Sequence, residues 1–123
     1  MRKEINYVLF YYSKDDLMNF NESYYYMENL IMSQDFSGIS KDFTAMLYLT
    51  GKESGYIYIS YINGIKKIEP VKHDSANIYL TMTLDVFEQL INGQLDVLRA
   101  FTTGKIQAKG NVILALAIYN SFI

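Results

Sequence analysis

The sequence contains no cysteine and no tryptophan, and it has only one proline and one histidine among its 123 residues. Without cysteine the chain cannot form a disulfide, a thiolate zinc site, an iron–sulfur cluster or a cysteine nucleophile. One histidine is also too few for a multi-histidine metal site. We therefore expect neither a metal nor a cofactor.

A strong charge of one sign is missing as well. Eleven basic and thirteen acidic residues give a net charge of −2, whereas a nucleic-acid-binding domain needs a strongly positive surface. Half of the residues are apolar, which argues against disorder. The length fits one compact domain over residues 1–123, and we expect no nucleic acid among its partners.

Long hydrophobic runs are also absent. The longest, Val112–Tyr119, has eight residues, and a membrane-spanning helix needs about twenty. The apolar stretch Tyr7–Tyr12 ends at Ser13-Lys14-Asp15-Asp16 without the small-residue cleavage site of a signal peptide. The sequence thus predicts a cytoplasmic protein.

The first third of the chain has the periodicity of a helix. Ser13 and Asp16 form the pattern of a capping pair, and apolar residues then recur at steps of three and four, which predicts a helix over residues 14–32. The recurring residues are Leu17, Phe20, Tyr24, Met27 and Ile31. Residues 5–12 fit an extension of this helix or a separate strand.

From residue 43 the pattern changes to that of strands. Residues 43–50, 56–62 and 65–69 are rich in apolar and β-prone types. Asn63-Gly64 between the last two is typical of a two-residue hairpin, so the three segments predict an antiparallel meander. A further strand is predicted over residues 77–82, with its apolar residues on one face.

The last third alternates helix and strand. Thr83 can cap a helix over residues 84–92, and a short helical turn follows at Leu95–Thr102. Gly104 and Gly110 bracket a short strand predicted over residues 105–109. The closing helix, predicted over residues 111–122, is apolar nearly all round, so we expect both of its faces to be covered.

A distinctive motif lies between Asn77 and Leu116. A strand ends at Thr83, an acidic and apolar helix ends at Gly93, and the pattern Phe-x-x-Gly-Lys-Ile-x-x-x-Gly-Asn precedes the apolar helix. The residues of this pattern are Phe101, Gly104, Lys105, Ile106, Gly110 and Asn111. The segment closely resembles the sterol carrier protein 2 family of lipid-binding domains. It departs from that family at Asn77, where Asp is usual, and at Tyr56, near where many members carry Trp.

The resemblance implies an α+β fold, in which helices pack on one face of a five-stranded, mostly antiparallel sheet and enclose an apolar tunnel. Residues 1–40 would form a helical N-terminal region, and residues 41–123 the core sheet and helices. The tunnel would be lined by inward-facing residues of the strands and of the helices that face them. We assign to it Met46, Ile59, Ile78, Leu80, Met82, Phe87, Leu90, Leu98, Phe101, Ile106, Leu114 and Ile118.

The resemblance further implies non-catalytic binding or transfer of an apolar lipid, such as a fatty acid or fatty acyl-CoA. Burying a dozen methylene groups at about 0.8 kcal/mol each supplies micromolar affinity or better without a polar contact. Two alternatives stay open. One is a structural or interaction domain whose tunnel is filled by its own side chains. The other is an accessory protein that presents an apolar biosynthetic intermediate, such as a quinone precursor.

The polar residues give little support to catalysis. His73-Asp74 lies in a loop and fits a solvated turn, and Asp15-Asp16 fits the start of a helix, where carboxylates complement the helix dipole. Lys105 and Lys109 fit a solvated strand edge better than a phosphate site. We expect no enzymatic activity.

Two surfaces bear on partners. Tyr56 and Tyr58 share one strand face, which fits either an amphipathic solvent-facing surface or the interface of a homodimer. The predicted helix 14–32 carries four acidic residues against Lys14 alone, so we expect weak or no direct binding to anionic membranes.

Overall fold

The computed structural model describes residues 18–39 and 41–120. The helices in this part are α2 (Phe20–Ser33), α3 (Leu84–Ile91), α4 (Val97–Thr102) and α5 (Val112–Asn120). The strands are β1 (Phe43–Thr50), β2 (Gly55–Ile62), β3 (Ile65–Glu69), β4 (Ile78–Thr83) and β5 (Gln107–Gly110). Residues 5–12, the start of the predicted helix 14–32 and the end of the predicted helix 111–122 lie outside the described residues.

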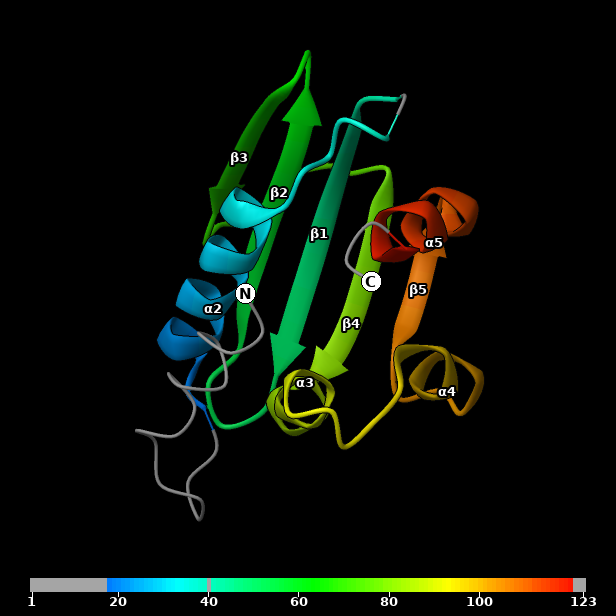
Figure 1. Ribbon diagram of the computed structural model, residues 1–123. Helices are drawn as coiled ribbons and strands as arrows, with labels where there is room; N and C mark the ends of the chain where they lie inside the picture. The colour runs from blue at the N-terminus through cyan, green and yellow to red at the C-terminus, as the bar shows by residue number, and fades with distance from the viewer. Residues whose placement is uncertain (1–17, 40, 121–123) are drawn as a thin grey trace.

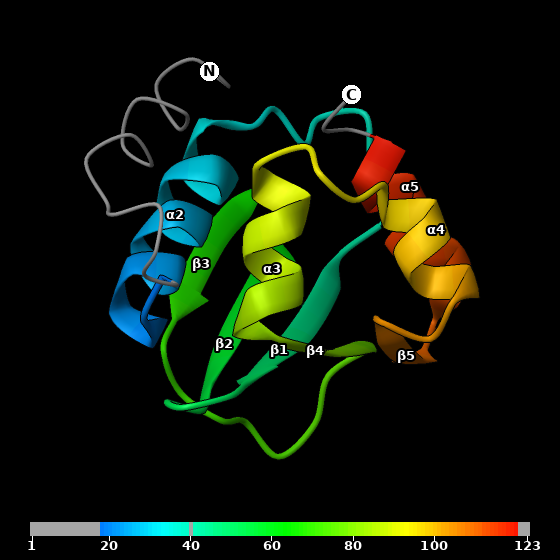
Figure 2. The same ribbon diagram turned by 90° about the horizontal axis from the view of Figure 1, so that it is seen from below.

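The strands form one sheet in the order β3-β2-β1-β4-β5 (Figure 1). All neighbours pair antiparallel except β1 and β4, which are parallel with Ala45 opposite Ile78. The predicted meander and the mostly antiparallel sheet are confirmed. The parallel pair arises because the chain between β3 and β4 crosses the face of the sheet opposite to α2 and α3 (Figure 2).

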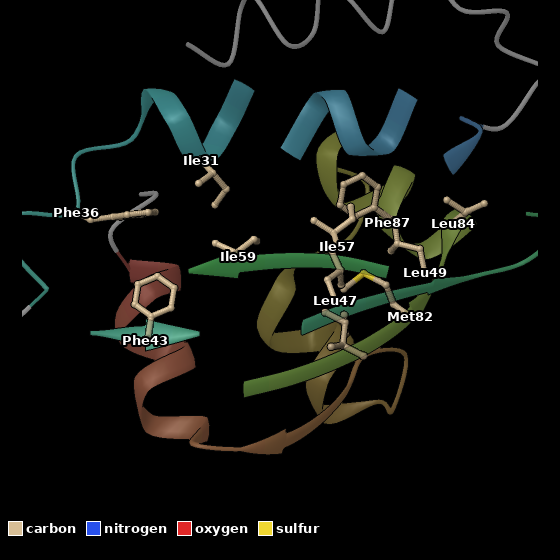
Figure 3. Close-up of a cluster of buried hydrophobic side chains, with 12 residues drawn as sticks. Ile31, Phe36, Phe43, Leu47, Leu49, Ile57, Ile59, Met82, Leu84 and Phe87 are labelled. Carbon is tan, nitrogen blue, oxygen red and sulfur yellow. The ribbon is translucent and has the colours of Figure 1, made fainter. Parts of the chain in front are cut away.

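The helices gather on the other face. In both views α2 and α3 cover the sheet, while α4 and α5 lie at its β5 end (Figures 1 and 2). Because successive side chains of a strand point to opposite faces, alternate residues of β1, β2 and β4 point toward these helices. Figure 3 shows Leu49, Ile57 and Met82 in one cluster with Phe87 of α3, and Ile31 of α2 approaching Ile59. This cluster is the hydrophobic core.

Within the described residues the predicted helix 14–32 is interrupted, because residues 18 and 19 are not helical and α2 begins at Phe20. Asn19 is extended, and its side-chain oxygen accepts a hydrogen bond from Glu22 N at 2.8 Å, while Glu22 Oε1 accepts one from Asn19 N at 2.8 Å. This reciprocal pair is a capping box, which fixes the first helical turn after Asn19. The predicted capping pair Ser13 and Asp16 lies outside the described residues.

The predicted strand 105–109 was wrong at its start. The backbone N–H groups of Lys105 and Ile106 both donate to the carbonyl of Ala100, at 2.9 and 3.1 Å. These two residues therefore close the end of α4, and β5 joins the sheet only from Gln107.

A hydrogen-bonded junction around Asn77 fixes where α5 begins. Asn77 Oδ1 accepts from Thr44 N at 2.8 Å, and Asn77 O accepts from Asn111 N at 2.9 Å. Asn111 Oδ1 in turn accepts from Leu114 N at 3.0 Å and so caps the start of α5. The junction thus ties β1, β4 and the start of α5 together.

Candidate functional site

An apolar cavity of about 220 Å³ lies between the sheet and the helices. Residues from all four described helices, from β1, β2 and β4, and from the turn before β5 contribute to its wall. They are Met27, Ile31, Phe43, Ala45, Ile59, Ile78, Leu80, Met82, Leu90, Val97, Phe101, Ile106, Ala115, Ile118 and Tyr119. Every one is apolar except Tyr119, so the cavity offers hydrophobic contact and almost no hydrogen bonding.

The structure brings eight of the twelve predicted tunnel residues together around this cavity. These eight are Ile59, Ile78, Leu80, Met82, Leu90, Phe101, Ile106 and Ile118. The strand members follow from simple alternation, since Ile78, Leu80 and Met82 are two residues apart on β4.

The other four predicted residues lie elsewhere. Met46 is buried on the opposite face of β1, where its cross-strand partners are Tyr58 and Tyr79. Phe87 is buried in the core and packs edge-on against Tyr26. Leu98 is half exposed on α4, and Leu114 packs against the core and lines a separate open groove.

Seven residues of the cavity wall were not predicted from the sequence. Met27 and Ile31 belong to the apolar stripe recognised on the first helix, so their pattern could have placed them at the cavity. Phe43 and Ala45 lie on a strand that is apolar on both faces, where alternation gives no sign of the inward face. Ala115 and Tyr119 lie on α5, which is apolar on every side, so the sequence does not show which side faces inward. Val97 lies on α4, whose six residues are too few to show a helical period.

The titratable groups with shifted pKa values lie outside the cavity wall. Burial and the neighbouring Glu28 carboxylate raise the pKa of Tyr24, whose hydroxyl donates to Glu28 Oε2 and to Ile68 O at 3.2 Å each. Burial also raises the pKa of Glu88, and a backbone hydrogen bond from Ser37 lowers that of Asp35. Each shift has a local structural cause.

His73 lies on the outer face of the sheet, away from the cavity. Its ring stacks on Tyr58 with 3.5 Å between centroids, and its Nε2 lies 3.5 Å from Glu69 Oε1. His73 thus holds the crossing loop against the sheet, while Asp74 beside it is exposed. Within residues 18–39 and 41–120, no group of three or more acidic or histidine side chains is placed to bind a metal ion.

Several of the described tyrosines contact other parts of the chain. Tyr48 and Tyr56 stack on the outer face with 4.4 Å between centroids, and Lys72 lies over the Tyr56 ring. On α2, Tyr25 is 62% exposed, while Tyr24 and Tyr26 contact β3 and α3.

The expectation that both faces of the closing helix are covered was wrong. The inner side of α5 lines the cavity through Ala115, Ile118 and Tyr119. Its outer side is open, and Ile113 there is 82% exposed. An open groove of about 490 Å³ separates this outer side from Gly38, Ile39 and Lys41. No helix in the described part of the chain has the length and apolar character needed to cross a membrane.

The chain belongs to the SCP-2 sterol transfer family, whose model matches residues 39–122. This confirms the resemblance seen in the sequence and extends it upstream of the motif. A fatty acid-binding protein of Yarrowia lipolytica (strain CLIB 122 / E 150) is 38% identical over 66 residues, which are 54% of this chain. The match spans about half of that curated relative, 51% of its length.

Solved structures of the family share the fold. Sterol carrier protein 2 from Yarrowia lipolytica, in its apo form, is 30% identical with a TM-score of 0.54, over 65% of this chain and 66% of that one. Palmitated SCP2L2 from Aedes aegypti has a TM-score of 0.70 at 17% identity, over 85% of this chain and 95% of that one. Because the Aedes aegypti protein is only 17% identical, its similarity to this chain shows a shared fold and nothing about function.

Proposed function

We propose that this protein binds the hydrocarbon chain of a lipid, such as a fatty acid or fatty acyl-CoA, in the cavity beneath α5 and carries it without chemical change. The observation that carries the proposal is the composition of the cavity wall, which is apolar except for Tyr119. A water-excluding apolar cavity gives affinity through burial alone. Family membership and the relative named as a fatty acid-binding protein support the same ligand class.

The size of the cavity favours a slender ligand. Its volume of about 220 Å³ is below the range of about 300–1,000 Å³ usual for ligand pockets. One unbranched chain fits such a space better than a fused ring system. With Tyr119 as the sole polar wall residue, we propose that the polar end of the ligand stays outside the cavity.

Two alanines on α5 give a matched test. Ala115 lines the cavity and Ala117 faces outward, so Ala115→Leu fills the cavity while Ala117→Leu makes the same change of helix propensity outside it. We expect Ala115→Leu to weaken binding of a fluorescent fatty acid by about tenfold or more, because the added carbons take the place of ligand carbons. Ala117→Leu should bind like the original protein in vesicle-free solution. Equal affinities for both variants would contradict binding in this cavity.

The alternative functions can be distinguished by identifying the small molecule that co-purifies with the protein. We propose that mild purification followed by denaturation releases fatty acids or their thioesters, detected by mass spectrometry. Recovery of a quinone precursor would instead favour the accessory protein, and a ligand-free chain that fails to bind any fatty acid would favour the structural domain.

The remaining expectations belong to the same proposal. We propose one lipid-binding domain over residues 1–123, a cytoplasmic location and no catalytic step. The stacking of Tyr48 on Tyr56, and of His73 on Tyr58, favours a solvent-facing surface over a homodimer interface on the outer face. We also expect no attraction of α2 to anionic membranes, since it carries Glu22 and Glu28 and no basic residue.

A further inference from the structure

The outer side of α5 is an apolar stripe that carries no polar side chain before Asn120. Asn120 ends it, and before that residue every outward position is apolar. Val112 is 41%, Ile113 82% and Leu116 37% exposed, and Ala117 lies in line with them. A helix that faces water normally carries polar residues on that side. A continuous exposed apolar stripe therefore marks a surface that contacts something else.

The charges around this stripe are mainly positive, and the nearest acids in the sequence are Asp42 and Asp96. From residue 97 to the end the sequence has three basic residues and no acidic one, so this segment carries +3 while the rest of the chain carries −5. Arg99, Lys105 and Lys109 are exposed, and none of them forms an ion pair with another described residue. Lys41 adds a further cation, because it lines the groove beside Ile113. The nearest preceding acid, Asp96, is engaged as the cap of α4, where it accepts from Arg99 N at 3.0 Å.

The arrangement of the elements collects these features at one end of the molecule. In Figures 1 and 2, α4, β5 and α5 lie together at one end of the sheet, while α2 lies at the other end beside β3. The acidic α2 is thus far from the stripe. The inner side of α5 is at the same time a wall of the cavity, through Ala115, Ile118 and Tyr119.

We propose that the end formed by α4, β5 and α5 docks on the surface of an anionic phospholipid bilayer. The stripe of α5 lies among the outer acyl segments, and Lys41, Arg99, Lys105 and Lys109 face the phosphates and anionic headgroups. An apolar surface bordered by cations matches the chemistry of that boundary. The inference deepens the proposed function, because docking would place one cavity wall against the source of the ligand. It differs from the sequence-based expectation of weak or no binding to anionic membranes, which rested on the acidic first helix alone, because it uses a different surface from α2.

Vesicle co-sedimentation tests this proposal with the full chain. We expect clear binding to phosphatidylcholine vesicles that contain phosphatidylserine, weaker binding to phosphatidylcholine alone, and a decrease with added salt. Ile113→Gln should weaken binding by about tenfold, because the most exposed apolar side chain of the stripe is lost. Replacing Lys105 and Lys109 together by Gln should weaken it by about twenty-five-fold at low salt, at about fivefold for each cation.

Matched controls lie at other places in the fold. Ile65 is 69% exposed on β3, at the end of the sheet opposite to α5, so Ile65→Gln removes a similar side chain away from the surface. Lys52→Gln removes an exposed cation from the β1–β2 turn. Both variants should sediment with vesicles like the original protein. Absence of binding to both kinds of vesicle, or equal effects of Ile65→Gln and Ile113→Gln, would overturn the proposal.

Two further outcomes are distinguishable. If sedimentation velocity shows a dimer that Ile113→Gln dissociates, the stripe is an interface between two copies and the bilayer proposal fails. Fatty acid binding in vesicle-free solution reports on the cavity alone, and Ile113→Gln should leave it unchanged. A protein that binds vesicles as expected but binds no fatty acid would therefore contradict the proposed function and support the docking surface.

Discussion

At Gly110 the backbone has a φ of +89° and passes against Asn77. A Cβ placed on Gly110 would collide with the Asn77 carbonyl oxygen, the atom that accepts from Asn111 N. Two independent requirements, a left-handed conformation and a close approach of two backbones, therefore meet at this one residue. Since α5 starts next to it, Gly110 controls the position of a cavity wall.

We predict that Gly110→Ala lowers the free energy of unfolding by about 3 kcal/mol or more, because backbone strain and a backbone collision add together. Gly104 is the control, since its φ is +78° but nothing lies within 4 Å of an added Cβ. Gly104→Ala should cost only about 1–2 kcal/mol, the strain of a left-handed residue with a Cβ. Urea denaturation measures both. Equal losses would show that the contact with Asn77 does not matter.

Single residues were predicted well where their chemistry is local. Asn63 and Gly64 both have positive φ in the hairpin, as the pair predicts, and Thr83 caps α3 through a hydrogen bond from Val86 N. The departure from the family at Asn77 leaves its junction intact, because the side-chain oxygen that accepts from Thr44 N is present in Asn and Asp alike. Met46 was misplaced because both faces of β1 are apolar.

At the scale of elements, α2 depends on a residue of another element. Its last turn has no basic residue to complement the helix dipole. Lys66 of β3 takes this role, because its Nζ donates to Ile31 O and Met32 O at 3.1 Å each and also to Gln34 O. The same ammonium lies 5.3 Å from the centre of the Phe36 ring. Lys66 therefore fastens the end of α2 to the edge of the sheet.

We predict that Lys66→Met lowers the free energy of unfolding by about 1–2 kcal/mol, because the carbonyls at the end of α2 lose a charged donor. Lys67→Met on the same strand is the control. Lys67 is 63% exposed and pairs with Glu69 at 3.2 Å, and an exposed pair of this kind contributes about 0.5 kcal/mol or less. Thermal or chemical denaturation measures the loss of unfolding free energy in both variants. A larger loss for Lys67→Met would contradict this role of Lys66.

Elements with one clear apolar face could be predicted from sequence, and those without one could not be oriented. The alternation on β4 identified Ile78, Leu80 and Met82 as residues of one face, and the apolar stripe on the first helix contains Met27 and Ile31, which line the cavity although they were not assigned to it. On α5 the sequence shows apolar residues on every side, and packing alone decides which of them face the sheet. The contact partners of an element are set by distant parts of the chain, as Lys66 on β3 shows for α2.

At the scale of the whole molecule, the cavity exists only where two halves of the sheet meet. Phe43, Ala45 and Ile59 come from the meander, whereas Ile78, Leu80 and Met82 come from β4 on the far side of the crossing loop. The parallel pairing of β1 with β4 joins these two halves. The sequence predicted both halves as separate sets of strands, but the resemblance to the family was needed to place them in one sheet.

The parallel pairing of β1 with β4 also affects how fast the ligand-bound protein unfolds. Hairpins between consecutive strands close small loops, whereas β1 and β4 meet only after the intervening meander and crossing loop are ordered, so we expect the wall of the cavity to assemble late in folding. A ligand of a late-formed site should stabilise the native state and leave the folding transition state nearly unaffected. Palmitate at about one hundred times its dissociation constant should then slow unfolding by about a hundredfold and change refolding little. Stopped-flow unfolding and refolding with and without palmitate measure both rates, and acceleration of refolding instead would show that the site forms early.

A protein that unfolds slowly also exposes its peptide bonds to proteases slowly. Where proteolysis follows unfolding, loaded protein outlasts empty protein in proportion to the difference in unfolding rate. The supply of ligand would thereby set the abundance of its own carrier.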